Sequence, residues 1–162
     1  MKVLVFGPSG SGKTYIANAL YKKGITAFDA DKVEGLSGWY SREGKLIQKS
    51  VTSDEAINNH YSFLWNKEFL KSYLSQYKDV YLFGGSGNVF ELFDLFDKVF
   101  FLRIDPELQK QRLEQRNSSM DFTGDDLIIW GNWFEKEVIK RNVQLLDASL
   151  NPEEIFAVIS KT

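Results

Sequence analysis

A glycine-rich segment near the start of the chain constrains the fold more than any other feature of the sequence. Residues 7–14 read Gly-Pro-Ser-Gly-Ser-Gly-Lys-Thr and match the pattern G-x-x-x-x-G-K-[ST] at every fixed position. An apolar run at residues 3–6 precedes the segment, and residues 15–20 have helical character. Because glycines allow successive N–H groups to turn inward at the start of a helix, this order of strand, loop and helix predicts a phosphate-binding loop.

The loop residues have expected contacts with a nucleoside triphosphate. Lys13 would reach the β- and γ-phosphates, and the hydroxyl of Thr14 would bind the Mg²⁺ that accompanies the nucleotide. The residues expected to bind the nucleotide are Gly7, Pro8, Ser9, Gly10, Ser11, Gly12, Lys13 and Thr14. A GTP-binding protein ranks low because no N-K-x-D guanine motif appears.

Length and composition limit the classes of protein that this chain can belong to. With 162 residues, 43% of them apolar and 26% charged, it is expected to form one soluble domain, residues 1–162. A net charge of −2 supplies no broad cationic field, so nucleic acid is not expected as the main substrate. The absence of cysteine excludes disulfides and thiolate sites. We expect a cytoplasmic protein without a signal peptide or membrane span, as a monomer or weak homo-oligomer.

Strand and helix patterns alternate along the chain. Strands are expected at residues 2–6, 25–28, 80–83, 99–102 and 143–146, and helices at 13–22, 53–77, 106–117, about 130–141 and from 152 onward. Residues 35–49 are expected to be a loop with little regular structure. Because the strands are continuously apolar and separated by helices, the pattern predicts an α/β fold with a parallel sheet covered on both faces.

Two carboxylates follow the second expected strand, Asp29 and Asp31. Ligands of open parallel sheets bind beyond the carboxyl ends of the strands, so both are candidate substrate-binding residues. One would hold Mg²⁺ and the other would accept a proton from the phosphate acceptor. We assign Asp29 to the metal and Asp31 to the proton, although the sequence also allows the reverse assignment or a turn capped by one of them.

A glycine run follows the third expected strand. Gly84 and Gly85 would let the backbone approach a small substrate closely. Asn88 would either hydrogen-bond that substrate or cap the next helix.

Two arginines stand four residues apart on the helix expected at 106–117. Arg112 and Arg116 would face the site from the edge of a short polar lid, residues 117–127, and balance charge on the transferred phosphoryl group. The alternative is a solvated helix face, because Lys110 and Glu114 make this helix polar throughout.

Taken together, these motifs resemble the small P-loop kinases of the adenylate kinase and shikimate kinase group. The resemblance implies a three-layer P-loop NTPase fold, a five-stranded parallel sheet in the order 2-3-1-4-5, ATP and Mg²⁺ as ligands, and an acceptor-binding segment at about residues 33–77. It also implies that Asp29 and Asp31 correspond to the group's D-x-D, Gly84 and Gly85 to its substrate glycines, and Arg116 to its lid arginine. The loop that packs on adenine would be Asp147, Ala148, Ser149 and Leu150.

The chain departs from individual members of this group. The third strand lacks the proline–arginine turn typical of adenylate kinases, and no E-x-x-F-R segment occurs near residues 50–65, unlike shikimate kinases. We expect an ATP-dependent kinase acting on a nucleoside or nucleotide first and on another hydroxylated metabolite second. A nucleotide-binding regulatory ATPase with a protein partner is the alternative from another class.

Overall fold

A five-stranded parallel sheet forms the centre of the computed structural model, which describes residues 1–115 and 124–161. In chain order its strands are β1 (Lys2–Phe6), β2 (Ala27–Asp29), β5 (Val80–Phe83), β6 (Lys98–Arg103) and β7 (Gln144–Asp147). Their order across the sheet is β2-β5-β1-β6-β7, and every neighbouring pair is parallel. Counted along the chain among these five strands, this is the expected order 2-3-1-4-5, so the predicted sheet is confirmed.

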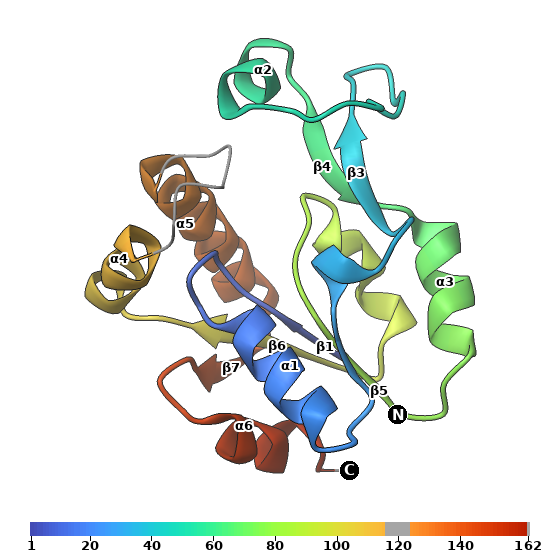
Figure 1. The fold of residues 1–162 in the computed structure, drawn as a ribbon, viewed down its shortest axis with the longest axis vertical. Helices are drawn as coiled ribbons and strands as arrows, with labels where there is room; N and C mark the ends of the chain where they lie inside the picture. Colours follow the sequence, from blue (N-terminus) through green and yellow to red (C-terminus); the bar gives the residue numbers. More distant parts are fainter. Residues whose placement is uncertain (116–123, 162) are drawn as a thin grey trace.

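Helices cover both faces of the sheet (Figure 1). One face packs against α1 (Lys13–Lys22) and α6 (Pro152–Ile159), and the other packs against α3 (Lys67–Ser75), η2 (Val89–Leu95) and α5 (Gly124–Arg141). The helix α4 (Pro106–Glu114) lies beside α5.

Strand β1 shows why its sequence is continuously apolar. Val3 and Val5 belong to the core beneath α1 and α6, whereas Leu4 and Phe6 belong to the core beneath the opposite helices. Side chains alternate between the faces of a strand, so a strand covered on both faces needs apolar residues at every position.

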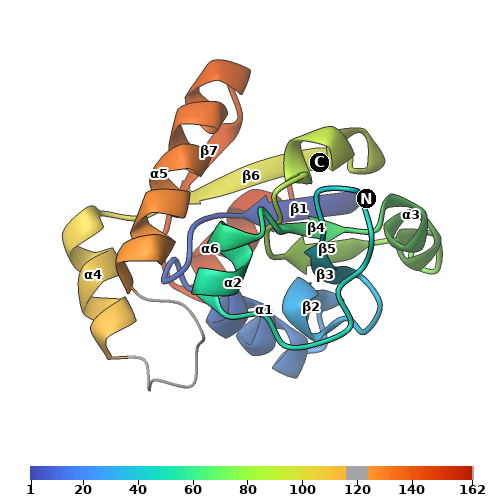
Figure 2. The same ribbon diagram turned by 90° about the horizontal axis from the view of Figure 1, so that it is seen from above.

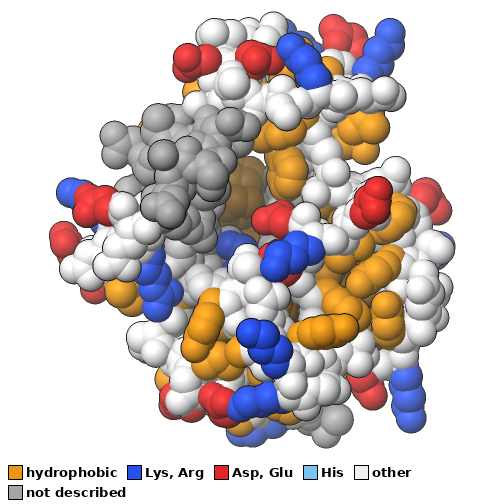
Figure 3. Space-filling view, viewed as in Figure 1, with side chains coloured by type: hydrophobic (Ala, Val, Ile, Leu, Met, Phe, Trp, Pro, Cys, Tyr) orange, Lys and Arg blue, Asp and Glu red, His pale blue; other side chains and the backbone are white. Residues whose placement is uncertain are grey.

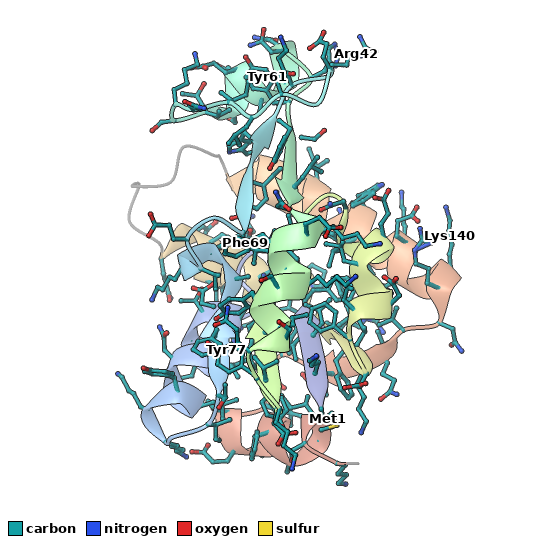
Figure 4. All side chains as sticks on the ribbon, turned by 90° about the vertical axis from the view of Figure 1, so that its right-hand side faces the viewer. Met1, Arg42, Tyr61, Phe69, Tyr77 and Lys140 are labelled. Atoms are coloured by element: carbon teal, nitrogen blue, oxygen red, sulfur yellow. The ribbon has the colours of Figure 1, made fainter. Side chains whose placement is uncertain are left out.

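A projecting segment, residues 37–65, stands out from the sheet and was not predicted. It contains β3 (Ser37–Tyr40), α2 (Ser53–Asn58) and β4 (Ser62–Trp65), and β3 and β4 form a separate antiparallel sheet. Figure 1 shows it above the main sheet, with both chain termini at the opposite end of the molecule. In Figure 4, Arg42 and Tyr61 lie at its outer end, and Phe69 and Tyr77 lie along α3 below it. Figure 2 looks down on it, with α3 and α4 at opposite sides of the molecule.

The single helix expected over residues 53–77 is therefore wrong, and the loop expected over 35–49 is wrong at residues 37–40, where β3 forms. Helix α2 ends at Asn58, and His60 adopts a left-handed backbone with a φ of 56°. Asn66 then starts a second helix, its side chain accepting a hydrogen bond from the Phe69 N–H. The helical spacing of apolar residues is real on each side of this break, but pairing of β4 with β3 overrides it between the two helices.

Other element boundaries lie close to the expected ones, except that α5 begins at Gly124, within the expected lid. The terminal helix α6 begins with the predicted cap at Asn151, which forms a reciprocal capping box with Glu154. Strand β2 begins two residues later than expected and includes Asp29. Residues 116–123, which include most of the expected lid, lie outside the described residues. Within the part of the chain that is described, no helix combines the length and apolar character that a membrane crossing requires.

Candidate functional site

The phosphate loop connects β1 to α1 in a conformation that depends on its glycines. Gly10 and Gly12 have φ angles of 85° and 95°, in the left-handed region that side chains disfavour. Gly12 is the N-cap of α1, where no side chain makes a capping hydrogen bond and the first turn has no acidic residue. The partial positive charge of this helix end is therefore directed to the loop, as anion binding requires.

Lys13 is folded over this loop. Its Nζ donates to the carbonyl oxygens of Gly7 at 2.7 Å and Pro8 at 2.8 Å. The ammonium is partly buried, so carbonyl dipoles replace water around its charge. Phosphate oxygens carry full negative charge and can take over these positions, which makes Lys13 suited to its expected phosphate contact.

Thr14 and Asp29 are brought together by the fold, as a shared Mg²⁺ site requires. Thr14 Oγ1 donates to Asp29 Oδ2 at 2.9 Å, and Asp29 is only 7% exposed. Asp29 Oδ1 accepts from the Asp31 N–H at 3.0 Å, which caps η1 (Ala30–Lys32). Asp29 can thus cap the turn and also be available to a metal, because one of its oxygens holds the turn and the other faces the phosphate loop.

The oxygen donors at this position fit Mg²⁺. A hydroxyl and a carboxylate are the ligands that Mg²⁺ prefers, and phosphate oxygens and water complete its shell when a nucleotide binds. Among the described residues no group of three His, Asp or Glu side chains could hold a metal without such help. The exposed Asp31 follows within η1, two residues after Asp29.

Helix α4 contributes two side chains to the phosphate loop. Arg112 Nη1 donates to the Gly10 carbonyl at 3.1 Å, and Gln109 Nε2 donates to the Ser9 carbonyl at 3.0 Å. Gln109 is 5% exposed and was not predicted. The only sequence signal for this contact was that Gln109 lies one helical turn before Arg112. The sequence does not reveal that this face of α4 is buried. Arg116 lies outside the described residues.

The glycine run after β5 lies against the D-x-D turn. A Cβ atom added to Gly84 would lie 2.5 Å from Ala30 Cβ and 3.1 Å from Trp65 Cζ2. The same addition at Gly85 would meet nothing nearer than the Gly7 carbonyl at 3.9 Å. Gly84 is therefore needed for packing against protein atoms, and approach of the run to a substrate stays a prediction.

Asn88 binds the projecting segment. Its Oδ1 accepts from the Trp65 N–H at 3.0 Å and from Ser86 Oγ at 2.8 Å, while its Nδ2 donates to the Trp65 carbonyl at 2.9 Å. It makes no side-chain cap on η2. The polar atoms of Asn88 that were expected to contact a substrate thus hold β4 in place, because this unpredicted strand lies within hydrogen-bonding distance of the amide.

The residues expected to pack on adenine follow β7. Asp147 Oδ1 accepts from the backbone N–H and the hydroxyl of Ser149, at 2.8 and 2.7 Å, and these bonds lower the pKa of Asp147. Ala148 is buried in the core, and Leu150 packs against it. Asp147 and Ser149 are exposed, and contact with adenine stays a prediction for all four residues.

A hollow separates the projecting segment from the body of the molecule. Figure 3 shows apolar side chains inside it and acidic and basic side chains along its lower edge. A second, open groove of about 440 Å³ lies between α1, β2 and α3. Its lining residues are Asn18, Tyr21, Ala27, Phe28, Asp29, Lys32, Val33, Glu34, Phe69 and Tyr73. Asp29 is the residue that this groove shares with the phosphate site.

Known proteins provide independent information on this arrangement. A family model described as an AAA domain matches residues 3–127. No curated protein sequence matches the chain.

Several solved structures of kinases have a similar fold. Shikimate kinase from Bacteroides thetaiotaomicron is 14% identical with a TM-score of 0.56, and the match covers 99% of both chains. Deoxyadenosine kinase from M. mycoides with bound dATP is 15% identical with a TM-score of 0.54, covering 99% of this chain and 97% of the other. A gluconokinase from Sinorhizobium meliloti 1021 is 16% identical with a TM-score of 0.53, covering 98% and 89%. These similarities confirm the predicted P-loop NTPase fold.

Proposed function

The chain belongs to the AAA domain family, and from this premise we propose that it is an ATP-dependent kinase that phosphorylates a small molecule. The observation that carries the proposal is the 2.9 Å hydrogen bond from Thr14 to Asp29. This bond joins the phosphate loop to the D-x-D turn, so the groups expected to bind the phosphate donor lie next to those expected to bind the acceptor. A phosphoryl transfer site requires this adjacency.

In the proposed reaction an acceptor oxygen attacks the γ-phosphorus while the bond to the β,γ-bridging oxygen breaks. ADP leaves with the electron pair of that bond, and the hydroxyl proton passes to Asp31. Lys13 and the loop N–H groups bind the phosphates, and Arg112 balances charge on the transferred group. Thr14 and Asp29 would hold Mg²⁺, which would supply further positive charge at the phosphates.

The proposal also ranks the classes of phosphate acceptor. A nucleoside or nucleotide ranks first, and another hydroxylated metabolite ranks second. By their names, the similar kinases use shikimate, deoxyadenosine and gluconate, which supports small-molecule acceptors as a class. We also propose that Asp147–Leu150 contacts adenine, that Arg116 acts from a lid, and that Gly85 lies beside the acceptor. Cytoplasmic ATP would supply the reaction.

An acceptor-dependent assay tests this proposal. The protein is incubated with ATP and Mg²⁺ and with a panel of nucleosides, nucleotides, sugars and hydroxy acids, and ADP release is measured. We expect release that depends on one class of acceptor. Slow ATP hydrolysis that no acceptor stimulates would instead support a regulatory ATPase.

The Lys13→Ala variant links the activity to the loop. We expect kcat to fall by about 10²- to 10³-fold, because one preorganised donor to the reacting phosphates is lost. Lys22→Ala, at the exposed end of the same helix, is the matched control and should retain activity. Circular dichroism checks that both variants fold, and equal activity in the two would contradict the assigned site.

A further inference from the structure

The indole of Trp65 is a buried polar group that the reaction above does not use. Trp65 is 2% exposed, and its Nε1–H has no hydrogen-bond partner among the described residues. Buried donors in folded proteins are nearly always paired, so an unpaired one calls for a physical explanation.

This indole lies at the expected acceptor site. Its Cζ2 is 3.1 Å from the position that a Cβ on Gly84 would occupy, and the indole nitrogen is one ring atom away from Cζ2. Ala30, whose Cβ lies beside the same position, is the central residue of the D-x-D turn. The indole therefore lies at the carboxyl ends of β2 and β5, where ligands of such sheets bind.

The position of Trp65 is fixed by its backbone. Asn88 pairs with both the N–H and the carbonyl of Trp65, and the Gly87 N–H donates to the Phe63 carbonyl at 2.7 Å. The backbone groups of this strand end are thus satisfied, whereas the indole donor is not. A fixed, unpaired donor is suited to bind an oxygen of a ligand.

The surrounding charges favour an acceptor without a negative group. Asp29 and Asp31 bring two carboxylates to this end of the sheet. Among the described residues of β3, β4, η1 and the 84–88 loop, Lys32 is the one cation, and it lines the groove against α3. The cations Lys13 and Arg112 contact the phosphate loop and are expected to be engaged by the phosphates of ATP. A phosphate or carboxylate on the acceptor would then lie near like charges, whereas hydroxyl groups can donate to carboxylates.

Further aromatic rings lie next to Trp65 along the projecting segment. Trp39 and Phe63 are paired across β3 and β4, with ring centroids 5.3 Å apart. Phe63 and Trp65 are two residues apart on β4, so they share one face of the strand with Trp39. Figure 3 shows apolar side chains of this segment along the hollow.

We infer that the acceptor is an uncharged ring compound with hydroxyl groups, and that Trp65 Nε1–H donates a hydrogen bond to one of its neutral oxygens. This inference rests on the proposed kinase function. Trp65 would contact the acceptor only, so its role is separate from that of the phosphate loop.

Matched acceptor pairs test the charge of the acceptor. Deoxynucleosides are compared with their 5′-monophosphates, and glucose with gluconate, by ADP release and by mass of the product. We expect phosphorylation of neutral members, and the nucleoside and sugar arms identify the ring. Phosphorylation of the anionic members alone overturns the inference and leaves the kinase function standing. Phosphorylation of no member, together with no acceptor-dependent ADP release in the broader panel described above, overturns both.

The Trp65→Phe variant tests the hydrogen bond with the neutral acceptor so identified. We expect the KM for the acceptor to rise about fivefold to tenfold, the loss expected for one hydrogen bond, with the KM for ATP unchanged. Trp133→Phe, exposed on α5, is the matched control. An unchanged acceptor KM in Trp65→Phe would overturn the inference.

A spectroscopic readout covers the case in which Trp65→Phe does not fold. In ¹⁵N-labelled wild-type protein the four tryptophan indole signals are recorded with ATP analogue and acceptor. We expect the proton of the Trp65 indole to move downfield and exchange more slowly with water when the acceptor is added. No change in any indole signal at saturation would overturn the contact.

Discussion

Gly84 and Gly85 are adjacent in the chain, yet a side chain would meet very different surroundings at each. We expect Gly84→Ala to lower the free energy of unfolding by about 1–3 kcal/mol, since the new methyl group would overlap Ala30 and Trp65. Gly85→Ala should change it by less than about 0.5 kcal/mol, because the nearest atom is 3.9 Å away. Urea unfolding measures both, and equal effects would contradict the packing described for Gly84.

Asp29 and Asp31 are expected to differ in what their loss affects. Asp29→Asn should raise the Mg²⁺ concentration needed for half-maximal activity, because Asp29 accepts from the Thr14 hydroxyl that is expected to bind the metal. Asp31→Asn should lower kcat by about 10²- to 10⁴-fold at saturating Mg²⁺, because it removes the expected proton acceptor. The reverse pattern in Mg²⁺ titrations of the two variants would exchange their roles.

Single residues also show which parts of the site can be predicted from the sequence and which cannot. Lys13 and Thr14 were identified because a linear motif fixes their spacing. Gln109 and Trp65 were missed, since each meets the site through burial against a segment far away in the chain. Their residue types are common in helices and cores, so the sequence offered no distinguishing pattern.

Asn88 joins the projecting segment to the loop after β5 through two hydrogen bonds with the Trp65 backbone, beside the bond from the Gly87 N–H to the Phe63 carbonyl. We expect Asn88→Ala to lower the free energy of unfolding by about 1–3 kcal/mol, because the partly buried N–H and carbonyl of Trp65 lose their partner. Hydrogen exchange should accelerate at the Trp65 amide and leave β1 amides protected.

A variant of the same size provides the control for this element. Asn88→Asp keeps the oxygen that accepts from Trp65 N–H and removes the donor to the Trp65 carbonyl. We expect intermediate exchange at Trp65. Unchanged exchange in both variants would show that strand pairing alone holds β4.

At the scale of the whole molecule, stability should fall at both ends of the pH range. Hydrogen bonding to the N-terminal ammonium lowers the pKa of Asp79, and hydrogen bonding to Ser149 lowers that of Asp147. Their contribution is present above the usual value of 3.8 and is lost as pH falls through the folded-state pKa values.

Buried tyrosines determine how stability falls at alkaline pH. Burial raises the pKa of Tyr73 and of Tyr81, and a hydrogen bond with Tyr77 adds to the effect at Tyr73. Their contribution is present below the usual value of 10.0 and is lost as pH rises through the folded-state values. Thermal unfolding from pH 2 to pH 12 should give a plateau between these limits. Tyr73→Phe should reduce the alkaline decline, whereas Tyr15→Phe, exposed on α1, should not.

The sequence by itself determined the central sheet, its strand order through a family resemblance, and the phosphate loop. These features depend on neighbouring residues: continuous apolar runs, capping residues and a motif of fixed spacing all act over a few positions. The break at His60 was not determined in this way, because residues 53–77 have an apolar spacing that a helix and a strand can both use.

Only the tertiary structure decided how the acceptor side is built. Pairing of β4 with β3 placed Trp65 against Gly84, and this contact gave Asn88 a partner that no local pattern indicated. Gln109 likewise reaches the phosphate loop at Ser9 from 100 positions further along the chain. Such contacts arise from packing between distant segments, whose free energy depends on the complete fold and is not written in any short stretch of sequence.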